Sequence, residues 1–374
     1  MKCLRRVTVL SLCLTTILCS SLPHKKNPTM RGCDLRFQLT NIQTSGEPSY
    51  RLTFHDKRIK VSKIIYDDLS PVSDDWIRTK KNGKFGFIDL DEKEVMDFEF
   101  SFIGDFHEGY VVFREGDDRK DPRGFLNKKG DLLGGKYYDM TYNFQNGVAG
   151  VEINKKYGLI DRNGKIVVPI KYDFITGMFN GWAVFKREEH QGLINAQGQE
   201  KKFIHDKYDL RGYFYEGTIV FKHYQKMGIM DSNFNVIIPP IYEYLGNFKE
   251  GLVRFEQGKK WGFLDQNGKV VIEAKFDSEY DFSEGFASVT IGDKVGIINR
   301  KGEYLVEPKF SHISSFHEGL AVVEDGGKRG FINTNAEWVI PPMFEKLDQF
   351  KDGVFTFVIK DKWGFVNLRG CKNK

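Results

Sequence analysis

The chain has 374 residues, of which 29% are charged and 14% aromatic, and its formal net charge is +5. Three positive charges, Lys2, Arg5 and Arg6, stand in an N-terminal segment that we expect to be removed, which leaves a nearly neutral chain. Nucleic-acid binding needs basic residues concentrated on one surface, whereas lysine and arginine are spread along this chain. The composition therefore argues against a nucleic-acid partner.

Residues 1–20 have the pattern of a secretory signal peptide. The basic start is followed by an apolar run, residues 7–19, which is shorter than the roughly 20 residues that a membrane-spanning helix needs. Small residues at Ser20 and Ser21 suit cleavage there. We therefore expect an exported protein, located in the periplasm, at the outer-membrane surface or outside the cell.

Cys19 adds a second interpretation of the same segment. A cysteine directly after the apolar run can be the lipidated first residue of a bacterial lipoprotein, and that lipid would then be the protein's contact with the membrane. Leu18 departs from this pattern, because a small residue usually precedes the lipidated cysteine. Lipidation and free secretion both stay open.

Only Cys33 and Cys371 follow a cleavage after Ser20, and they stand at opposite ends of the chain. Two cysteines are too few for a zinc site or for a disulfide scaffold. A bridge between them would require Cα atoms about 4.4–6.8 Å apart. Such a bridge would favour an architecture whose ends meet, and the sequence leaves the pairing open.

Residues 21–50 are rich in proline, serine, asparagine and lysine, and we interpret them as a tether that ends in an irregular strand over residues 36–39. Residues 51–374 form the predicted repeat domain. Its first part, residues 51–69, has the features of the second half of a repeat, because Tyr66 keeps the aromatic position of the other copies. We expect this degenerate unit to cap the array.

One glycine recurs along the repeat domain at intervals of 34 to 38 residues. The nine copies are Gly86, Gly124, Gly158, Gly192, Gly228, Gly262, Gly296, Gly330 and Gly364. A fixed period of this length indicates stacked supersecondary units.

Three further features keep the same register. An aromatic residue lies 20 positions before a repeat glycine at Tyr66, Tyr138, Tyr172, Tyr208, Tyr242, Phe276, Phe310 and Phe344. A turn of the form Phe-x-Glu/Asp-Gly follows it in most copies, as at residues 282–285. An aspartate or asparagine stands three residues after every repeat glycine, and we expect its side chain to cap backbone N–H groups of a turn.

Each copy predicts a meander of three short strands. Residues 320–323, 330–333 and 338–340 illustrate these strands, and proline is expected to end the third of them. A unit this thin cannot close a core alone, so the aromatic residues of stacked copies should form one continuous core. We expect the repeat glycine to allow close approach of a neighbouring backbone or ring.

Residues 259–269 read Lys-Lys-Trp-Gly-Phe-Leu-Asp-Gln-Asn-Gly-Lys, and Trp261 and Trp363 keep the tryptophan before the repeat glycine. In this pattern the chain resembles the WG repeat family, also called KWG repeats, over residues 51–374. The resemblance implies a bacterial, mostly β repeat protein with no general catalytic motif.

The predicted fold is therefore all-β, with tandem repeats of about 34 residues. We favour an open, twisted, solenoid-like array of β-meanders. The alternative is a closed β-propeller, in which the short segment after the aromatic residue would be the fourth strand of each blade.

The sequence predicts no catalytic residue, no metal site and no cofactor. The recurrent acids are interpreted as turn residues, and the histidines lack the spacing of metal ligands. Trp182, Trp261, Trp338 and Trp363 could stack on sugars or peptides, although residues in repeat register are expected in the core. We expect a non-enzymatic binding or structural module at the cell envelope with a protein or glycan partner. The alternatives are an exported carbohydrate-active enzyme and a passive spacer.

Overall fold

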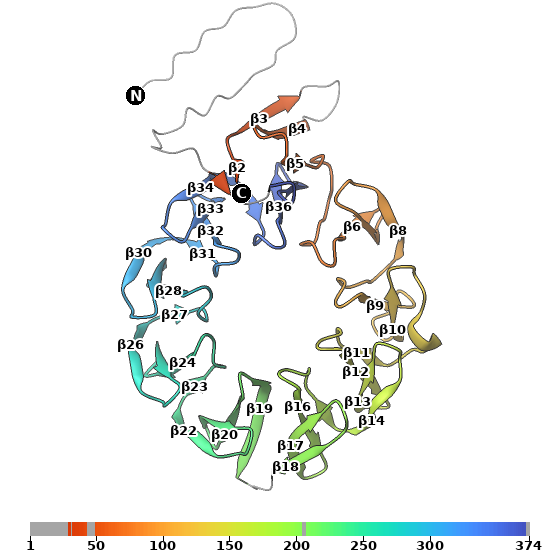
Figure 1. Ribbon diagram of the computed structural model, residues 1–374, viewed down its shortest axis with the longest axis vertical. Coiled ribbons are helices and arrows are strands. Elements are labelled where there is room, and N and C mark those ends of the chain that lie inside the picture. The colour runs from red at the N-terminus through yellow and green to blue at the C-terminus, as the bar shows by residue number, and fades with distance from the viewer. Residues whose placement is uncertain (1–28, 31, 43–48, 204–206, 372–374) are drawn as a thin grey trace, which may run out of the picture.

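The computed structural model describes residues 29–30, 32–42, 49–203 and 207–371. The predicted signal peptide, residues 1–20 with Cys19, lies outside the described residues. The described chain forms nine antiparallel sheets that follow one another around a ring (Figure 1). The all-β, tandem-repeat class predicted from the sequence is confirmed.

Seven of the nine described sheets have four strands, one has three and one has two. Within a sheet, successive strands run from the centre of the ring to its outside (Figure 1). The innermost strands are β11 (Met140–Thr141), β15 (Phe174–Ile175), β19 (Tyr208–Tyr215), β23 (Tyr244–Leu245), β27 (Ser278–Glu279), β31 (His312–Ile313) and β35 (Lys346–Leu347). The second strands are β6 (Ile77–Lys81), β9 (Tyr110–Arg114), β12 (Val148–Ile153), β16 (Trp182–Arg187), β20 (Thr218–His223), β24 (Leu252–Gln257), β28 (Phe286–Ile291), β32 (Leu320–Asp325) and β36 (Val354–Ile359).

The third strands carry the repeat glycines. They are β7 (Lys84–Ile88), β10 (Arg123–Asn127), β13 (Lys156–Asp161), β17 (His190–Asn195), β21 (Lys226–Asp231), β25 (Lys260–Asp265), β29 (Lys294–Asn299), β33 (Lys328–Asn333) and β37 (Lys362–Asn367). The outermost strands are β8 (Glu94–Phe100), β14 (Ile166–Tyr172), β18 (Glu200–Phe203), β22 (Val236–Tyr242), β26 (Val270–Phe276), β30 (Tyr304–Phe310), β34 (Trp338–Phe344) and β5 (Lys60–Val61). The 3₁₀ turn η1 (Leu133–Gly135) follows β10.

The repeat glycine leaves room for a bulge in the outermost strand. A Cβ added to Gly262 would lie 2.5 Å from the carbonyl oxygen of Ile272. The pairing of β25 with β26 shifts register at this point, between the pairs Trp261 with Phe276 and Phe263 with Ile272. A side chain at this position would collide with the bulged backbone. The predicted close approach at the repeat glycine is thus confirmed.

Proline lies inside the outermost strand and does not end it. Pro169, Pro239 and Pro308 are residues of β14, β22 and β30, each of which is bulged opposite its repeat glycine. An edge strand tolerates proline because its outer side forms no ladder hydrogen bonds. The outermost strand therefore continues to the aromatic residue. The segment that follows the aromatic residue forms the innermost strand of the next sheet, which gives that sheet its fourth strand.

Tyr208 is the one aromatic that the sequence assigned to the wrong place. Phe203 ends β18 opposite Gln191, as Phe276 ends β26 opposite Trp261. Tyr208 begins β19 of the next sheet and pairs with His223. The extra residues before Lys207 lengthen the distance between the aromatic residue and the next repeat glycine. Counting back 20 positions from that glycine therefore selected Tyr208 instead of Phe203.

The predicted turn caps are confirmed in every described copy. The Asp265 carboxylate, for example, accepts hydrogen bonds of 2.9 Å from the backbone N–H groups of Asn267 and Lys269. The same bonds are made by Asp89, Asn127, Asp161, Asn195, Asp231, Asn299, Asn333 and, to one N–H group, Asn367.

The core lies between neighbouring sheets. One cluster joins Phe263 and Phe276 of one sheet to Phe282 and Val289 of the next. Similar clusters repeat around the described ring, so each sheet is covered by its two neighbours. The stacking of thin units is as predicted. The core is a series of separate clusters between sheets, however, and not the one continuous core expected from the sequence.

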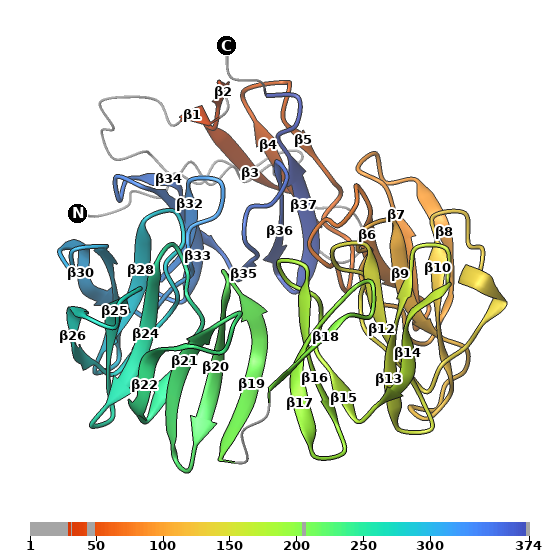
Figure 2. The same cartoon turned by 60° about the horizontal axis from the view of Figure 1, so that its bottom comes forward.

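The ring is closed, which corrects the preference for an open array and selects the β-propeller alternative. β5 pairs with β37 through Val61 and Val366, so a segment from the start of the chain is the outermost strand of the last sheet (Figure 2). Leu69 and Ile77 of the first sheet region also share a buried cluster with Phe365. Within residues 51–69, β5 and Tyr66, which bridges Trp363, therefore complete the last sheet instead of capping the start of an array.

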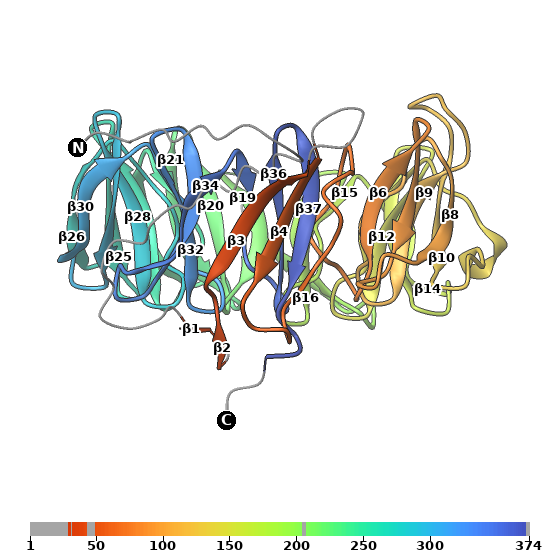
Figure 3. The same ribbon diagram turned by 90° about the horizontal axis from the view of Figure 1, so that it is seen from above.

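The described part of the predicted tether is folded. β1 (Thr29–Met30) pairs with β2 (Cys33–Asp34), and β3 (Phe37–Ile42) pairs with β4 (Ser49–Phe54) beside β37 (Figure 3). Leu52 of β4 is buried in the same cluster as Val366 and Leu368 of the last sheet. The described residues of the predicted tether, 29–30, 32–42 and 49–50, thus belong to two hairpins attached to the ring closure, which corrects the interpretation as a tether.

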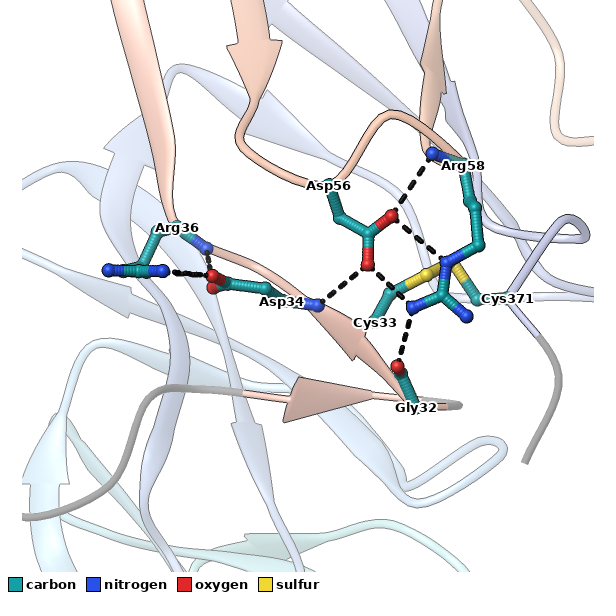
Figure 4. Close-up of polar contacts among 7 residues, drawn as sticks. All are labelled: Gly32, Cys33, Asp34, Arg36, Asp56, Arg58 and Cys371. Carbon is teal, nitrogen blue, oxygen red and sulfur yellow. Dashed lines mark hydrogen bonds and ion pairs between the residues drawn. A yellow bond between two sulfur atoms is a disulfide. The ribbon is translucent and has the colours of Figure 1, made fainter. Parts of the chain in front are cut away.

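A disulfide between Cys33 and Cys371 joins the first hairpin to the end of the last sheet, with Cα atoms 5.5 Å apart (Figure 4). Arg58 donates a hydrogen bond of 2.7 Å to the Gly32 carbonyl and another of 2.6 Å to Asp56. Arg58 holds the pKa of Asp56 well below its usual range. The covalent bond and these contacts hold the N-terminal segment against the closure.

We predict that replacing both Cys33 and Cys371 by serine lowers the free energy of unfolding by about 2–5 kcal/mol, because the bridge no longer restricts the unfolded chain. Amide exchange should accelerate most in β5 and β37, where the N-terminal segment closes the ring. Urea unfolding and hydrogen exchange would measure both effects. Reductant should change the wild type in the same way and leave the double variant unchanged; equal unfolding of oxidised and reduced wild type would contradict the prediction.

Ala336 occupies a left-handed turn position, with φ of 60°, where five other copies have a left-handed glycine. We predict that Ala336→Gly stabilises the protein by about 0.5–1 kcal/mol, since the strain relieved exceeds the added chain entropy. Gly130→Ala is the matched reverse change, because its φ is 82° and no atom lies within 4 Å of an added Cβ. Urea midpoints that move in the same direction for both variants would contradict this account.

Candidate functional site: the inner rim of the ring

The inner rim consists of nine two-residue turns in the described chain, each joining an innermost segment to a second strand. Both residues of each turn have positive φ, which is the type I′ geometry of tight hairpins. The turns point toward the central opening of the ribbon (Figure 1). They are Asp74–Asp75, Glu108–Gly109, Asn146–Gly147, Asn180–Gly181, Glu216–Gly217, Glu250–Gly251, Glu284–Gly285, Glu318–Gly319 and Asp352–Gly353.

Acidic residues of these turns connect neighbouring sheets. The Glu250 carboxylate accepts hydrogen bonds from the N–H groups of Glu284, at 2.6 Å, and Gly285, at 3.0 Å. Glu108 accepts in the same way from Asn146 and Gly147 of the following turn. The sequence analysis interpreted these acids as turn residues; the structure shows that they also bind the next turn around the rim.

The residue just before each turn, the rim position, differs from copy to copy. The residues at this position are equivalent because each pairs, across its turn, with the residue that follows the turn. The nine residues are Ser73, His107, Gln145, Phe179, Tyr215, Lys249, Ser283, His317 and Lys351. Hydroxyl, imidazole, amide, aromatic and ammonium groups thus alternate around a rim whose backbone repeats, so the rim has different chemistry on each side.

Three aromatic rings and a lysine gather at one part of the rim, which we call the rim patch: Phe179, Tyr213, Tyr215 and Lys249. The Phe179 ring lies 5.0 Å from that of Tyr213 and 5.6 Å from that of Tyr215, centroid to centroid. The Lys249 ammonium donates a 2.6 Å hydrogen bond to the Tyr215 hydroxyl. Tyr213 remains 46% exposed. Exposed rings with nearby polar groups suit stacking against a sugar or a peptide side chain.

A local irregularity places Tyr213 in this patch. The pairing of β19 with β20 shifts register between Arg211 and Tyr215, and Gly212 within that interval has φ of 72°. The bulge makes β19 the longest innermost strand described. No repeat-based pattern in the sequence marks Tyr213, because its position follows from this bulge.

One seam between sheets carries a buried charged cluster. Arg254 of β24 lies 3.3 Å from Glu279 of β27 and 3.1 Å from Asp281, measured between nitrogen and oxygen atoms. Glu279 is only 5% exposed. The equivalent positions in five other copies are apolar, namely Ile103, Ile175, Leu245, Ile313 and Leu347, and one copy has the buried threonine Thr141.

Burial raises the pKa of Glu279 to about 8, with Asp281 and Glu256 acting in the same direction and Arg254 opposing them. The related pair Arg78 and Asp105 joins the first two sheets, with 3.7 Å between its charged atoms. Because the pair recurs at another seam, we interpret the Arg254 cluster as a contact between sheets. Glu279 and Asp281 both contact the Arg254 guanidinium, so the cluster connects β24 to the next sheet through side chains.

The predicted site residues lie in the framework of the ring. The repeat glycines are in the third strands, as described above. Trp182, Trp261, Trp338 and Trp363 are partly buried against core clusters, so they contribute to sheet packing. His107 and His317 share the rim position in separate sheets, and His205 lies outside the described residues. Among the described residues, no three metal-binding side chains are grouped.

Within the described chain, no helix has the length and apolar character needed to cross a bilayer.

The sequence profile described as "WG containing repeat" matches residues 59–85, 85–117, 124–157, 157–189, 227–261, 261–294, 296–328 and 330–363. These matches cover more than half of the chain, so the chain belongs to the WG repeat family. No curated protein matches the sequence.

Two solved structures are similar to the chain at low sequence identity. The chain is similar to the structure titled "Crystal structure of the eukaryotic initiation factor", with a TM-score of 0.52 and 8% identity over 88% of this chain and 98% of that one. A second structure, dihydro-heme d1 dehydrogenase NirN in complex with DHE, has a TM-score of 0.42 and 11% identity over 71% of this chain and 72% of that one. At these identities the likeness concerns the fold alone.

We predict that Glu279→Gln changes how stability depends on pH. The folded-state pKa of about 8 exceeds the ordinary value of 4.5, so between these pH values the unfolded chain loses a proton that the folded chain keeps. Wild-type stability should therefore fall as pH rises through this window, and the variant should lack that contribution. Relative to wild type, the Tm of Glu279→Gln should rise from pH 5 to pH 8.

Glu307→Gln is the control, because Glu307 is an exposed glutamate of β30, the outermost strand of the same sheet. Its Tm should stay parallel to that of wild type at every pH. A parallel curve for Glu279→Gln as well would show that Glu279 ionises normally in the folded protein.

Proposed function

We propose that this protein is an exported, non-enzymatic binding module of the bacterial cell envelope, and that the inner rim is its partner-binding surface. One observation carries the proposal. The backbone, turns and core residues recur around the ring, whereas the nine rim positions hold six residue types, of which serine, histidine and lysine occur twice. A surface that varies on a repeated framework suits recognition of one partner rather than a structural role shared by all copies.

Export is supported by two features of the chain. Residues 1–20 have the composition of a signal peptide. Cys33 and Cys371 form a disulfide, and such bonds persist mainly in oxidising compartments outside the cytoplasm. Cys19 keeps its proposed role as a lipid attachment site if cleavage falls before it.

A non-enzymatic role is supported by how the acids are used. Carboxylates of the Asp265 type cap turns, and those of the Glu250 type bind the following turn. The unusual carboxylates, Glu279 and Asp281, both pair with Arg254 in a seam. These contacts give each group a structural task, which weighs against the carbohydrate-active enzyme considered from the sequence.

The rim patch indicates the kind of contact that a partner makes. Exposed Tyr213 and its neighbour Phe179 offer aromatic faces, while Tyr215 and Lys249 supply polar groups beside them. A protein or glycan of the envelope has the mixed apolar and polar surface that such a patch recognises.

The test uses the mature, disulfide-bonded protein and isolated envelope fractions of the source bacterium. We predict that Tyr213→Ser weakens retention on the envelope roughly tenfold, since one stacked ring contributes about 1 kcal/mol or more. The matched control is Tyr224→Ser, because Tyr224 is 76% exposed in the turn between β20 and β21, away from the rim. Co-sedimentation at several protein concentrations would measure the affinity.

Retention that is equal for wild type, Tyr213→Ser and Tyr224→Ser would contradict binding through the rim patch. Export is tested separately, by cell fractionation and intact mass of the native protein. A cytoplasmic protein that keeps residues 1–20 would contradict the envelope location, and an acyl mass on Cys19 would establish a lipid anchor.

A further inference from the structure

A groove lies between the second N-terminal hairpin and the segment that closes the ring. Its volume is about 420 Å³, within the range of small-molecule sites. Leu52, Phe54, Ile59 and Ile64 form its buried base, and Tyr50 and Val61, which are only partly buried, line it above that base. Ile65, at the same groove, is 55% exposed. The groove therefore has an apolar lining that continues to the surface.

Three cations line the same groove: Arg51, Lys57 and Lys63. All three are exposed, and none of their side chains forms an ion pair or hydrogen bond with another residue in the described chain. Elsewhere on the surface many lysines pair with an acid, as Lys60 does with Asp91 at 2.7 Å. The groove thus combines an apolar lining with unpaired positive charge.

Glu92 is the one carboxylate among the residues that line the groove. It is already engaged, because it accepts a 2.8 Å hydrogen bond from the Tyr66 hydroxyl and 3.3 Å bonds from the Lys63 backbone N–H. Both of these donors belong to the segment that closes the ring. Glu92 therefore leaves Arg51 and Lys57 without an acidic partner, and the groove keeps an excess of positive charge.

We propose that this groove binds a small anionic amphiphile, a free carboxylate with an acyl chain of medium length. The chain would lie against Tyr50, Val61 and Ile65, whose accessible apolar surface it would remove from water. The carboxylate would lie among Arg51, Lys57 and Lys63, which supply charged donors. A cation of the same chain length lacks this second contact and is repelled by the same residues.

The site also touches the element that closes the ring. Val61 and Ser62 line the groove, and Val61 pairs with Val366 of the last sheet while the Ser62 hydroxyl accepts a 2.8 Å hydrogen bond from the Phe365 N–H. β4 on the other side belongs to the hairpin held near the disulfide (Figure 2). A ligand in the groove therefore bridges the hairpin and the closing strand and should stabilise both.

The experiment uses the mature, oxidised protein and sodium dodecanoate below its critical micelle concentration, measured by isothermal titration calorimetry. Two probes separate the contributions of chain and head group: dodecyltrimethylammonium has the chain with a positive head, and acetate has the head without the chain. We predict saturable 1:1 binding of dodecanoate, at least tenfold weaker binding of the cation, and no detectable binding of acetate.

Variants identify the groove as the site. Lys57→Glu combined with Lys63→Glu should weaken dodecanoate binding more than tenfold, whereas Lys269→Glu combined with Lys301→Glu, an equal charge reversal on turns of two other sheets, should not. The apolar arm is Ile65→Asp, with Ile241→Asp as its control because Ile241 is 60% exposed on β22.

These outcomes decide the proposal. Equal binding of dodecanoate and the dodecyl cation, or dodecanoate binding that is unchanged in the Lys57 and Lys63 double variant, would overturn it. Binding only to vesicles that contain anionic lipid, with none to free dodecanoate, would also overturn it in favour of a membrane surface. Circular dichroism and the Tm of each variant, compared with wild type, would confirm that the ring is intact.

Discussion

The structure depends on covering both faces of thin sheets. All six residues of β36 are buried, although side chains of a strand alternate between the two faces of its sheet. Such a sheet needs a neighbour on each side. An open array would leave one face of its first and last sheets exposed to water, whereas a ring gives every sheet two neighbours. The hydrophobic effect therefore favours closure once enough copies are present to turn through a full circle.

Closure requires that the two ends of the chain meet, and three kinds of contact achieve this. β5 supplies the outermost strand of the last sheet, a buried cluster joins the first sheet to the last, and a disulfide links Cys33 to Cys371. The N-terminal hairpins add apolar cover over the same region. The stability of the ring therefore depends on whether the disulfide is formed, and a ligand in the groove beside the closing segment would also affect it.

Some positions of the repeat are the same in most copies, and others vary from copy to copy. The repeat glycine, the turn caps and the aromatic core residues are held by steric and hydrogen-bond requirements that every sheet shares. The rim position is less restricted: the hydroxyls of Ser73 and Ser283 donate hydrogen bonds to a carbonyl of the next sheet, whereas the other copies hold amide, imidazole, aromatic or ammonium groups there. Phe179, Tyr215 and Lys249 could therefore differ between copies without cost to the fold, and such positions are where a specific partner can be recognised.

Much of the fold could be predicted from the sequence. The period of the repeat glycine predicted the number of units, and the residues three positions after it predicted the capped turns, because both signals are local. The candidate site was harder to predict. Tyr213 enters the rim patch through a bulge, and Glu250 bonds to a turn 34 residues away. Neither contact leaves a pattern in nearby residues. The insertion before Lys207 also changed the spacing between the aromatic residue and the next repeat glycine, so Tyr208 was assigned to the aromatic position that Phe203 occupies.

The sequence by itself determined the all-β class, the WG repeat, the turns and the place of the glycine in each unit, since these follow from sterics and hydrogen bonds within one copy. Only the tertiary structure decided that the array closes, that the hairpin β3–β4 and the strand β5 pack onto its last sheet, and that the turn acids join neighbouring sheets. The physical reason is that closure depends on the small rotation between adjacent sheets summed over the ring. The residues of a single repeat do not reveal this total rotation.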